Sequence, residues 1–272
     1  MKGAHIISKF SRSKTVVAVA IAAVLGSAFF ATNYSMTKAD DTVAIPLVAH
    51  RGYSDIYPEN TLSAFAGAIA CDAKYIEFDV QRTKDNQLVI FHDDDMLRIC
   101  NNYHKISDYT YDELLEFDVG AYKGDEFVKE RIPTFDQTLD LLAADDSILI
   151  VELKEIRNDE GFAEDVYNHV LAKGMVDRVV FASFNYDYLT TLDGLDENVS
   201  TMYISTMSSP SIVETNPADY YNLNRKYLSA RTVKAIHSVD AICFAYTAKT
   251  EKQILNMQSI GVDGVVSDGL NY

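Results

Sequence analysis

Cysteine, proline and glycine are scarce in this sequence, and tryptophan is absent. The 272 residues include three cysteines, five prolines and twelve glycines. Cys71, Cys100 and Cys243 are too few and too far apart for a disulfide framework or a paired-cysteine zinc site, although a single bridge between Cys71 and Cys100 stays open. No stretch rich in proline or glycine and no low-complexity segment divides the chain. One folded domain is therefore favoured over two.

Basic residues are also in short supply. The chain has 24 lysines and arginines against 40 acidic residues, a formal net charge of −16. Residues 1–39 contain five basic residues and no acidic one, which leaves 19 basic and 40 acidic residues, or −21, in the remainder. Such a body repels nucleic acid, and no basic run interleaved with aromatic residues offsets this. Nucleic acid is therefore excluded as a partner, and a bound cation would be one way to attract an anionic substrate.

The N-terminal 39 residues have the pattern of a targeting segment. Basic residues up to Lys14 precede the apolar run VVAVAIAAVLGSAFFA at 16–31, and Thr37-Lys38-Ala39 offers a small-residue cleavage site. This run is short for a bilayer span, which needs about 20 residues. We expect 1–39 to be a cleaved signal peptide, with an uncleaved membrane anchor as the alternative. Residues 40–272 would then form an extracytoplasmic catalytic domain, secreted or held at the membrane by its N-terminal segment.

From residue 45 onward, short apolar strands alternate with helical patterns. Eight predicted strands have the continuous apolar character of parallel strands buried on both faces, and they cover 45–50, 75–80, 147–153, 178–184, 200–205, 226–230, 241–247 and 263–268. Helices are expected after Asn60 and Thr61, and at 135–144, 159–173, 185–193, 232–239 and 249–260, with an irregular helical stretch around 209–222. The count, the length and the alternation predict an α/β fold, a (β/α)8 TIM barrel.

Two segments fall outside this alternation. Residues 87–92 form a further apolar strand after a turn at Lys84-Asp85-Asn86. Residues 93–133 are polar and weakly periodic, and we interpret them as an insertion after the second barrel strand, with one helix at 110–117.

Charged side chains follow the predicted barrel strands. His50 and Arg51 end the first strand, Glu77 and Asp79 lie near the end of the second, and the third ends with Glu152 and Lys154. Because the carboxyl ends of barrel strands meet at one mouth, these side chains are expected to lie together there. Residues at i and i+2 of a strand also share a face.

The three carboxylates of Glu77, Asp79 and Glu152 would repel one another at this mouth. A hard divalent cation such as Ca²⁺ or Mg²⁺, bound through oxygen, resolves that repulsion. The alternative is that salt bridges at the barrel mouth neutralise these charges without a metal.

The other polar residues of this region suit phosphodiester chemistry. His50 and His92 could serve as general acid and base, because an imidazole exchanges a proton near neutral pH. A purely structural role for either histidine stays open. Arg51 and Lys154 offer positive charge to a phosphate. Glu59-Asn60 opens the first helix, and Asn60 is a candidate for its N-cap.

Together these residues resemble the glycerophosphodiester phosphodiesterase family. The matching motifs run in order from residue 46 to residue 268: His50-Arg51-Gly52, Glu59-Asn60-Thr61, Glu77-x-Asp79 with Thr83 and Asp85, Val89, His92-Asp93, Leu97-Arg98, Phe117-Asp118-Val119-Gly120, Ile132-Pro133-Thr134, Glu152-Leu153-Lys154 and the closing GVDGVVSD at 261–268. A single motif of this kind is weak support, but the ordered series is specific.

The resemblance implies a TIM barrel with an insertion at about 93–133 and metal-dependent hydrolysis of glycerophosphodiesters to glycerol 3-phosphate and an alcohol. It implies a general acid–base pair in His50 and His92. It also implies metal ligands in Glu77, Asp79 and Glu152, phosphate contacts from Arg51 and Lys154, and a place for Glu59 beside the metal or the glycerol hydroxyls. The substrate would be a small or lipid-derived phosphodiester. Alternatives are a phospholipase D-like hydrolase of lysophospholipids or sphingolipids, and a non-catalytic binding protein that keeps the barrel.

Overall fold

A computed structural model describes residues 42–154 and 160–272 of the chain. The predicted N-terminal segment at 1–39 lies outside these residues. Within the described part of the chain, no helix is both long enough and apolar enough to cross a membrane.

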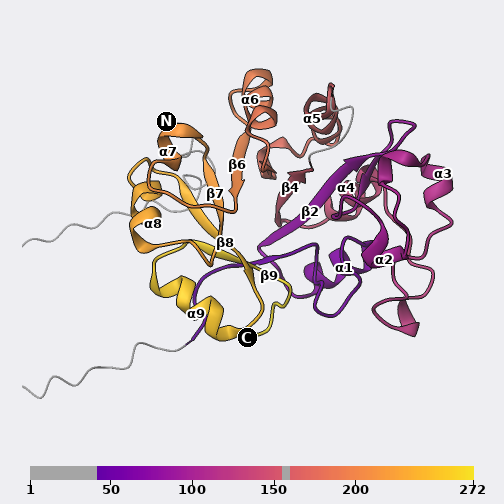
Figure 1. The fold of residues 1–272 in the computed structure, drawn as a ribbon, viewed down its shortest axis with the longest axis horizontal. Helices are drawn as coiled ribbons and strands as arrows, with labels where there is room; N and C mark the ends of the chain where they lie inside the picture. The colour runs from indigo at the N-terminus through magenta and orange to yellow at the C-terminus, as the bar shows by residue number, and fades with distance from the viewer. Residues whose placement is uncertain (1–41, 155–159) are drawn as a thin grey trace, which may run out of the picture.

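Eight parallel strands form a closed barrel, which confirms the predicted fold (Figure 1). The strands are β1 (Leu47–Ala49), β2 (Tyr75–Arg82), β4 (Ile148–Leu153), β5 (Val179–Ser183), β6 (Ser200–Ser205), β7 (Tyr220–Asn224), β8 (Ile242–Ala248) and β9 (Gly264–Ser267). They pair in the order β1-β9-β8-β7-β6-β5-β4-β2, and the pairing of β1 with β2 closes the ring.

Helices surround the barrel and connect its strands. They are α1 (Leu62–Ala70), α4 (Phe135–Leu142), α5 (Phe162–Ala172), α6 (Tyr186–Leu195), α7 (Ile212–Thr215), α8 (Ala230–His237) and α9 (Glu251–Ser259), with a 3₁₀ turn η3 (Val176–Arg178) before β5. Thr134 caps α4 as predicted, because its hydroxyl accepts a hydrogen bond from the backbone N–H of Gln137 at 3.1 Å.

The strands alternate between two apolar environments, as strands of a covered barrel do. Side chains such as Ile150, Met202 and Phe244 fill the barrel interior. Their strand neighbours, such as Val151 and Ala245, pack against the helices. The polar residues of the site interrupt the interior set at one end of the barrel.

One predicted strand was misplaced. The sixth barrel strand is β7 at 220–224, not 226–230, and it includes the end of the stretch predicted as irregular helix. Tyr221 and Leu223 are fully buried and pair in register with both neighbouring strands. By contrast Tyr227 is 55% exposed, and Ser229 caps α8. The two tyrosines and two asparagines of YYNLN concealed this strand, because they interrupt the continuous apolar run that marks the other barrel strands.

The insertion forms a small lobe beside the barrel, next to α4 (Figure 1). The extra strand β3 (Leu88–Ile90) leads into it and pairs antiparallel with the end of β2, outside the barrel as predicted. Its short elements are α2 (Leu97–Cys100), η1 (Ile106–Asp108), α3 (Tyr111–Leu114) and η2 (Asp125–Phe127). The predicted helix at 110–117 is thus a single turn. A separate apolar cluster that includes Val89, Met96 and Ile132 stabilises the lobe.

Candidate active site

The three predicted carboxylate ligands lie together inside the barrel. Glu77 and Asp79 project from β2 and Glu152 from the adjacent β4, where Asp79 and Glu152 are direct partners in the parallel register. One oxygen from each carboxylate lies within 4.8 Å of the others. All three residues are buried, with exposed fractions of 4%, 0% and 8%. Strand spacing alone predicted this arrangement.

One detail of that prediction was wrong. Glu77 and Asp79 lie in the middle of β2, because the strand continues to Arg82. The additional residues leave the barrel and pair with β3 instead of β4. The barrel part of the strand still ends close to Asp79, which keeps both carboxylates near the mouth.

The carboxylates repel one another strongly without a cation. Burial raises the pKa of Glu77 well above its usual value, and the charges of Asp79 and Glu152 raise it further. Burial and the charge of Asp79 raise the pKa of Glu152 as well. For Asp79, burial alone would raise the pKa, but the positive charges of Lys154, His92 and Arg51 hold it below its usual value.

A metal ion fits this donor set. Oδ1 of Asp79 is buried and accepts no hydrogen bond within the described residues, although such atoms are normally satisfied. The ammonium group of Lys154 lies 3.5 Å from that oxygen and donates to Oε1 of Glu152 at 2.7 Å. Three clustered carboxylates with one unsatisfied oxygen provide the hard ligands that Ca²⁺ and Mg²⁺ prefer.

Asn60 holds the other oxygen of Asp79. Its side-chain amide donates to Oδ2 of Asp79 at 2.8 Å. The expected capping role was wrong, because Thr61 is the N-cap of α1 and accepts from the N–H of Ala64. Asn60 itself has a positive φ of 57°, a conformation that asparagine tolerates better than most residues. Its side chain is thereby turned from the helix toward the carboxylates.

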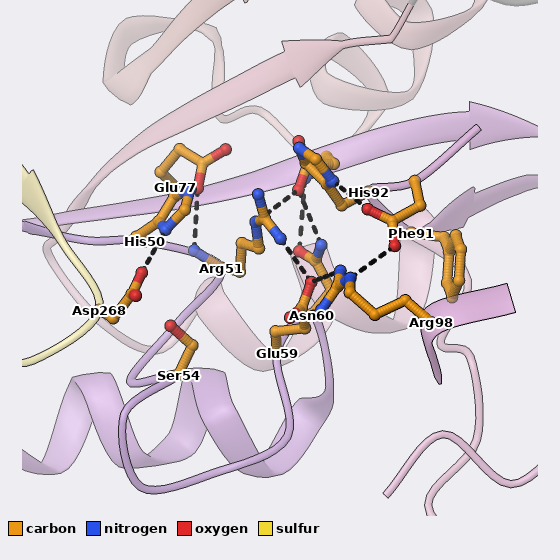
Figure 2. Close-up of polar contacts among 12 residues, drawn as sticks. His50, Arg51, Ser54, Glu59, Asn60, Glu77, Phe91, His92, Arg98 and Asp268 are labelled. Carbon is orange, nitrogen blue, oxygen red and sulfur yellow. Dashed lines mark hydrogen bonds and ion pairs between the residues drawn. The ribbon is translucent and has the colours of Figure 1, made fainter. Parts of the chain in front are cut away.

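Arg51 connects the carboxylates to the outer part of the site (Figure 2). Its backbone N–H donates to Oε2 of Glu77 at 2.8 Å, and its guanidinium lies 3.6 Å from Asp79 and donates to Glu59 at 2.6 Å. Arg51 and Gly52 both have positive φ angles. A Cβ atom on Gly52 would lie 2.6 Å from the backbone of Ala64, so only glycine allows this turn to pack against α1.

Each predicted catalytic histidine has a carboxylate on Nδ1 (Figure 2). His50 contacts Asp268 at 2.6 Å, and His92 contacts Asp93 at the same distance. A carboxylate at this position fixes the proton on Nδ1 and leaves Nε2 for chemistry. Burial lowers the pKa of His50, and the hydrogen bond with Asp268 opposes that shift.

Glu59 joins the barrel to the insertion. Besides the bond from Arg51, its two oxygens accept hydrogen bonds from Arg98 at 2.6 and 2.7 Å. Arg98 also donates to Asp93 at 2.7 Å, so Glu59 and the carboxylate behind His92 share one guanidinium. Burial alone would raise the pKa of Glu59, but the bond from Arg98 and the charge of Arg51 keep it lowered.

An open cavity of about 420 Å³ runs past both histidines. Arg51 and Glu59 also line it, whereas the three buried carboxylates and Lys154 do not. Arg51 therefore lies between the cavity and the carboxylates. The structure brings together all eight residues that the sequence nominated, on four segments that the barrel and the insertion place side by side.

Several residues of this site had no role assigned from the sequence. Asp93, Arg98 and Asp268 belonged to recognised motifs, but nothing in the spacing of Asp93 and Arg98 indicated that they contact His92 or Glu59. For Asp268 a signal existed, since it ends the last predicted strand just as His50 ends the first. Tyr122 and Lys123 of the insertion also line the cavity, and their weakly periodic surroundings gave no signal.

Comparison with known proteins gives independent information on what this site does. The sequence profile of the glycerophosphoryl diester phosphodiesterase family matches residues 50–271. The chain belongs to this family. A glycerophosphodiester phosphodiesterase of Bacillus altitudinis is 33% identical over 229 residues, which cover 82% of this chain and 94% of the relative. The family resemblance drawn from the sequence is therefore confirmed.

Solved structures of phosphodiesterases superpose closely on the barrel. A phosphodiesterase of Oleispira antarctica, in complex with the product sn-glycerol-3-phosphate, is 27% identical with a TM-score of 0.73, covering 82% of this chain and 92% of its own. A glycerophosphodiester phosphodiesterase of Parabacteroides distasonis is 26% identical with a TM-score of 0.71 over similar shares, 82% and 92%. As a member of the family, the chain is an enzyme of the phosphodiesterase class.

Proposed function

We propose that this enzyme hydrolyses glycerophosphodiesters to glycerol 3-phosphate and an alcohol, using a divalent cation and the histidine pair. The observation that carries the proposal is the cavity itself. Two histidines, each held by a carboxylate, face it together with Arg51, and Arg51 contacts a buried cluster of three acids. The Oleispira relative, whose structure holds sn-glycerol-3-phosphate, supports the same substrate class.

Glu77, Asp79 and Glu152 would hold the cation, Ca²⁺ or Mg²⁺. When bound, it would supply positive charge to a phosphoryl oxygen and offset the charge that develops there. Lys154 already neutralises part of the acidic cluster through Glu152 and Asp79, and its charge would be available to the phosphate once a cation replaces it.

The chain's own residues would bind the diester and move its protons. Arg51 lines the cavity and offers its guanidinium to the phosphate, while Glu59 orients that guanidinium and lies within reach of the glycerol hydroxyls. One of His50 and His92 takes the proton of the nucleophile, and the other gives a proton to the alkoxide as its bond to phosphorus breaks. Net hydrolysis consumes one water and returns both histidines to their starting states.

We also infer that the enzyme acts outside the cytoplasm. The support is the basic and apolar pattern of residues 1–39. An uncleaved segment would hold the barrel at the membrane, where lipid-derived diesters arise.

The test is release of glycerol 3-phosphate from glycerophosphodiesters, first with EDTA and then with Ca²⁺ or Mg²⁺ restored. His50→Ala and His92→Ala should each abolish turnover while the circular dichroism spectrum stays that of the folded barrel. Full activity in either variant, or in EDTA, would refute the mechanism. Faster cleavage of lysophosphatidylcholine than of glycerophosphocholine would instead favour the phospholipase D-like alternative.

A further inference from the structure

The cavity beside the histidines extends well beyond the groups that the proposed hydrolysis uses. Its volume of about 420 Å³ lies in the range of small-molecule sites. The lining is almost wholly polar and consists of His50, Arg51, Ser54, Glu59, His92, Asp93, Arg98, Tyr122, Lys123, Lys249 and Asp268. Four of these side chains are basic and three are acidic, although the chain as a whole is strongly acidic.

The acids of the cavity are all paired. Glu59 accepts from Arg51 and Arg98, and Arg98 also binds Asp93. Asp268 lies 3.0 Å from the ammonium group of Lys249. The negative charges of the lining are therefore already compensated by three of the four basic side chains.

Lys123 is the remaining cation. Its ammonium group donates to the backbone carbonyl of Ser54 at 2.7 Å, and no acidic side chain of residues 42–154 or 160–272 forms an ion pair with it. An ammonium group has three donors, so two remain for a ligand. Lys123 thus brings an uncompensated positive charge to the outer part of the cavity.

Neutral donors accompany this charge. The hydroxyl of Tyr122 accepts a hydrogen bond from the backbone N–H of Glu59 at 3.0 Å, which leaves its own proton to donate. Ser54 lies on the loop between β1 and α1, and its hydroxyl turns upward toward the side chains of the site (Figure 2). The loop and the insertion together present a surface suited to anionic or hydroxylated groups.

The cavity lining is poorly suited to a quaternary ammonium group. Such cations are bound by the faces of several aromatic rings. Among the described residues that line the cavity, Tyr122 is the single phenylalanine, tyrosine or tryptophan, and the uncompensated charge of Lys123 would repel a cation.

Building on the hydrolysis proposed above, we propose that Lys123 selects diesters whose outer alcohol carries a second phosphate. The scissile phosphate lies at the histidines and Arg51. The second phosphate accepts charge-assisted hydrogen bonds from Lys123, and Ser54 and Tyr122 lie where they can contact the alcohol between the two phosphates. Lys123 is a specificity residue in this arrangement, since it acts at a distance from the bond that breaks.

The experiment compares kcat/KM for three substrates of the full-length enzyme with its cation. Glycerophosphoglycerol has one phosphate, and bis(glycerophospho)glycerol adds a second to the same alcohol. We expect roughly tenfold preference for the latter, from one added charged contact and beyond the statistical advantage of two diester groups. Glycerophosphocholine should be the poorest of the three. The preference should weaken between about 0.01 M and about 1 M salt, over which the Debye length falls from ~30 Å to ~3 Å.

Two variants assign the preference to Lys123. Lys123→Gln keeps a donor for the Ser54 carbonyl and removes the charge, so it should lose most of the preference. Lys123→Arg keeps the charge and should restore it. Lys252→Gln removes an equal charge from an exposed position on α9 and is the matched control, with an unchanged preference.

The outcomes separate the two proposals. If the wild-type enzyme cleaves the diesters without preferring two phosphates, or if Lys123→Gln lowers kcat/KM for both glycerol diesters equally, the selection by Lys123 is refuted and the hydrolytic function stands. A preference for glycerophosphocholine refutes it too. No hydrolysis of any diester refutes both proposals.

Discussion

Nδ1 of His50 lies 2.6 Å from Oδ1 of Asp268, a residue 218 positions later in the chain. This contact follows directly from barrel closure. Ala49 of β1 pairs in register with Ser267 of β9, so the next residue on each strand emerges at the same point of the mouth. The closing strand therefore supplies the group that orients a histidine on the first.

Replacing that carboxylate should impair catalysis more than binding. In Asp268→Asn the amide can donate to Nδ1, which favours the tautomer with the proton on Nε2. We expect kcat to fall about 100-fold, the lower range of what a positioned acid or base contributes, with a smaller change in KM. Steady-state kinetics at several pH values would measure this.

A matched control exists on the outer helices. His169 of α5 and Asp136 of α4 form a similar pair at 2.8 Å, and neither residue lines the cavity. Asp136→Asn should leave kcat unchanged. Equal losses in the two variants would show that the effect of Asp268→Asn is a general one on folding.

In the absence of metal, repulsion within the acidic cluster should lower the free energy of unfolding. Since burial and its neighbours raise the pKa of Glu77, Glu77→Gln should remove repulsion and stabilise the metal-free protein. We expect a gain of about 1 kcal/mol, or roughly 2–4 °C in the melting temperature for a chain of this size. Saturating Ca²⁺ or Mg²⁺ should raise the melting temperature of the wild type and have little effect on the variant.

Calorimetry with and without the cation would test both expectations, the higher melting temperature of the metal-free Glu77→Gln variant and the stabilisation of the wild type by the cation. Glu197→Gln removes the same charge from an exposed turn and should change neither temperature measurably. A variant that melts below the metal-free wild type would contradict the argument from repulsion.

Much of the fold was predictable because apolar periodicity dominates it. Seven of the eight barrel strands were placed correctly, since their continuous Val, Ile and Phe content reflects burial on both faces. The strand at 220–224 was missed because tyrosine and asparagine replace most of the aliphatic residues in β7. The segment at 226–230 looks more regular in sequence, although it lies outside the sheet.

Strand geometry predicted one part of the site, whereas His92 and Glu59, which lie outside the strands, were nominated by residue type and by the family resemblance. Glu77, Asp79 and Glu152 lie on strands whose spacing is fixed, so their convergence could be derived. The roles of Asn60 and Arg98 depend on a loop with a positive φ and on an insertion that contacts the barrel through side chains. Neither has a periodicity that a sequence reveals.

The three thiols should differ greatly in reactivity, because the thiolate is the reactive form. Cys71 is exposed. Burial raises the pKa of Cys100 to about 11 and that of Cys243 to about 12, so both stay protonated at pH 8. A disulfide-exchange reagent at pH 8 should react quickly with one thiol per chain and with all three in denaturant. Loss of the fast phase in Cys71→Ser would assign it, and its persistence would show that another thiol is accessible.

Asn60 makes two separable contributions, one through its backbone and one through its amide. Asn60→Gly tolerates the positive φ but loses the hydrogen bond to Asp79. Asn60→Ala loses that bond and also adopts a strained conformation, which costs about 1–2 kcal/mol more. Both variants should bind Ca²⁺ or Mg²⁺ about 10- to 100-fold more weakly, as when a partner that orients a ligand is removed.

Asn101 provides the control, because it has a similar φ of 52° in the insertion and does not contact the carboxylates. Asn101→Ala should likewise be less stable in urea than Asn101→Gly, while both keep the metal affinity of the wild type. Equal stabilities of Asn60→Ala and Asn60→Gly would exclude the backbone contribution. Unchanged metal affinity in both variants would show that Oδ1 of Asp79 is positioned for the cation without the Asn60 amide. The register of β2 and β4, which places Asp79 beside Glu152, would then be sufficient.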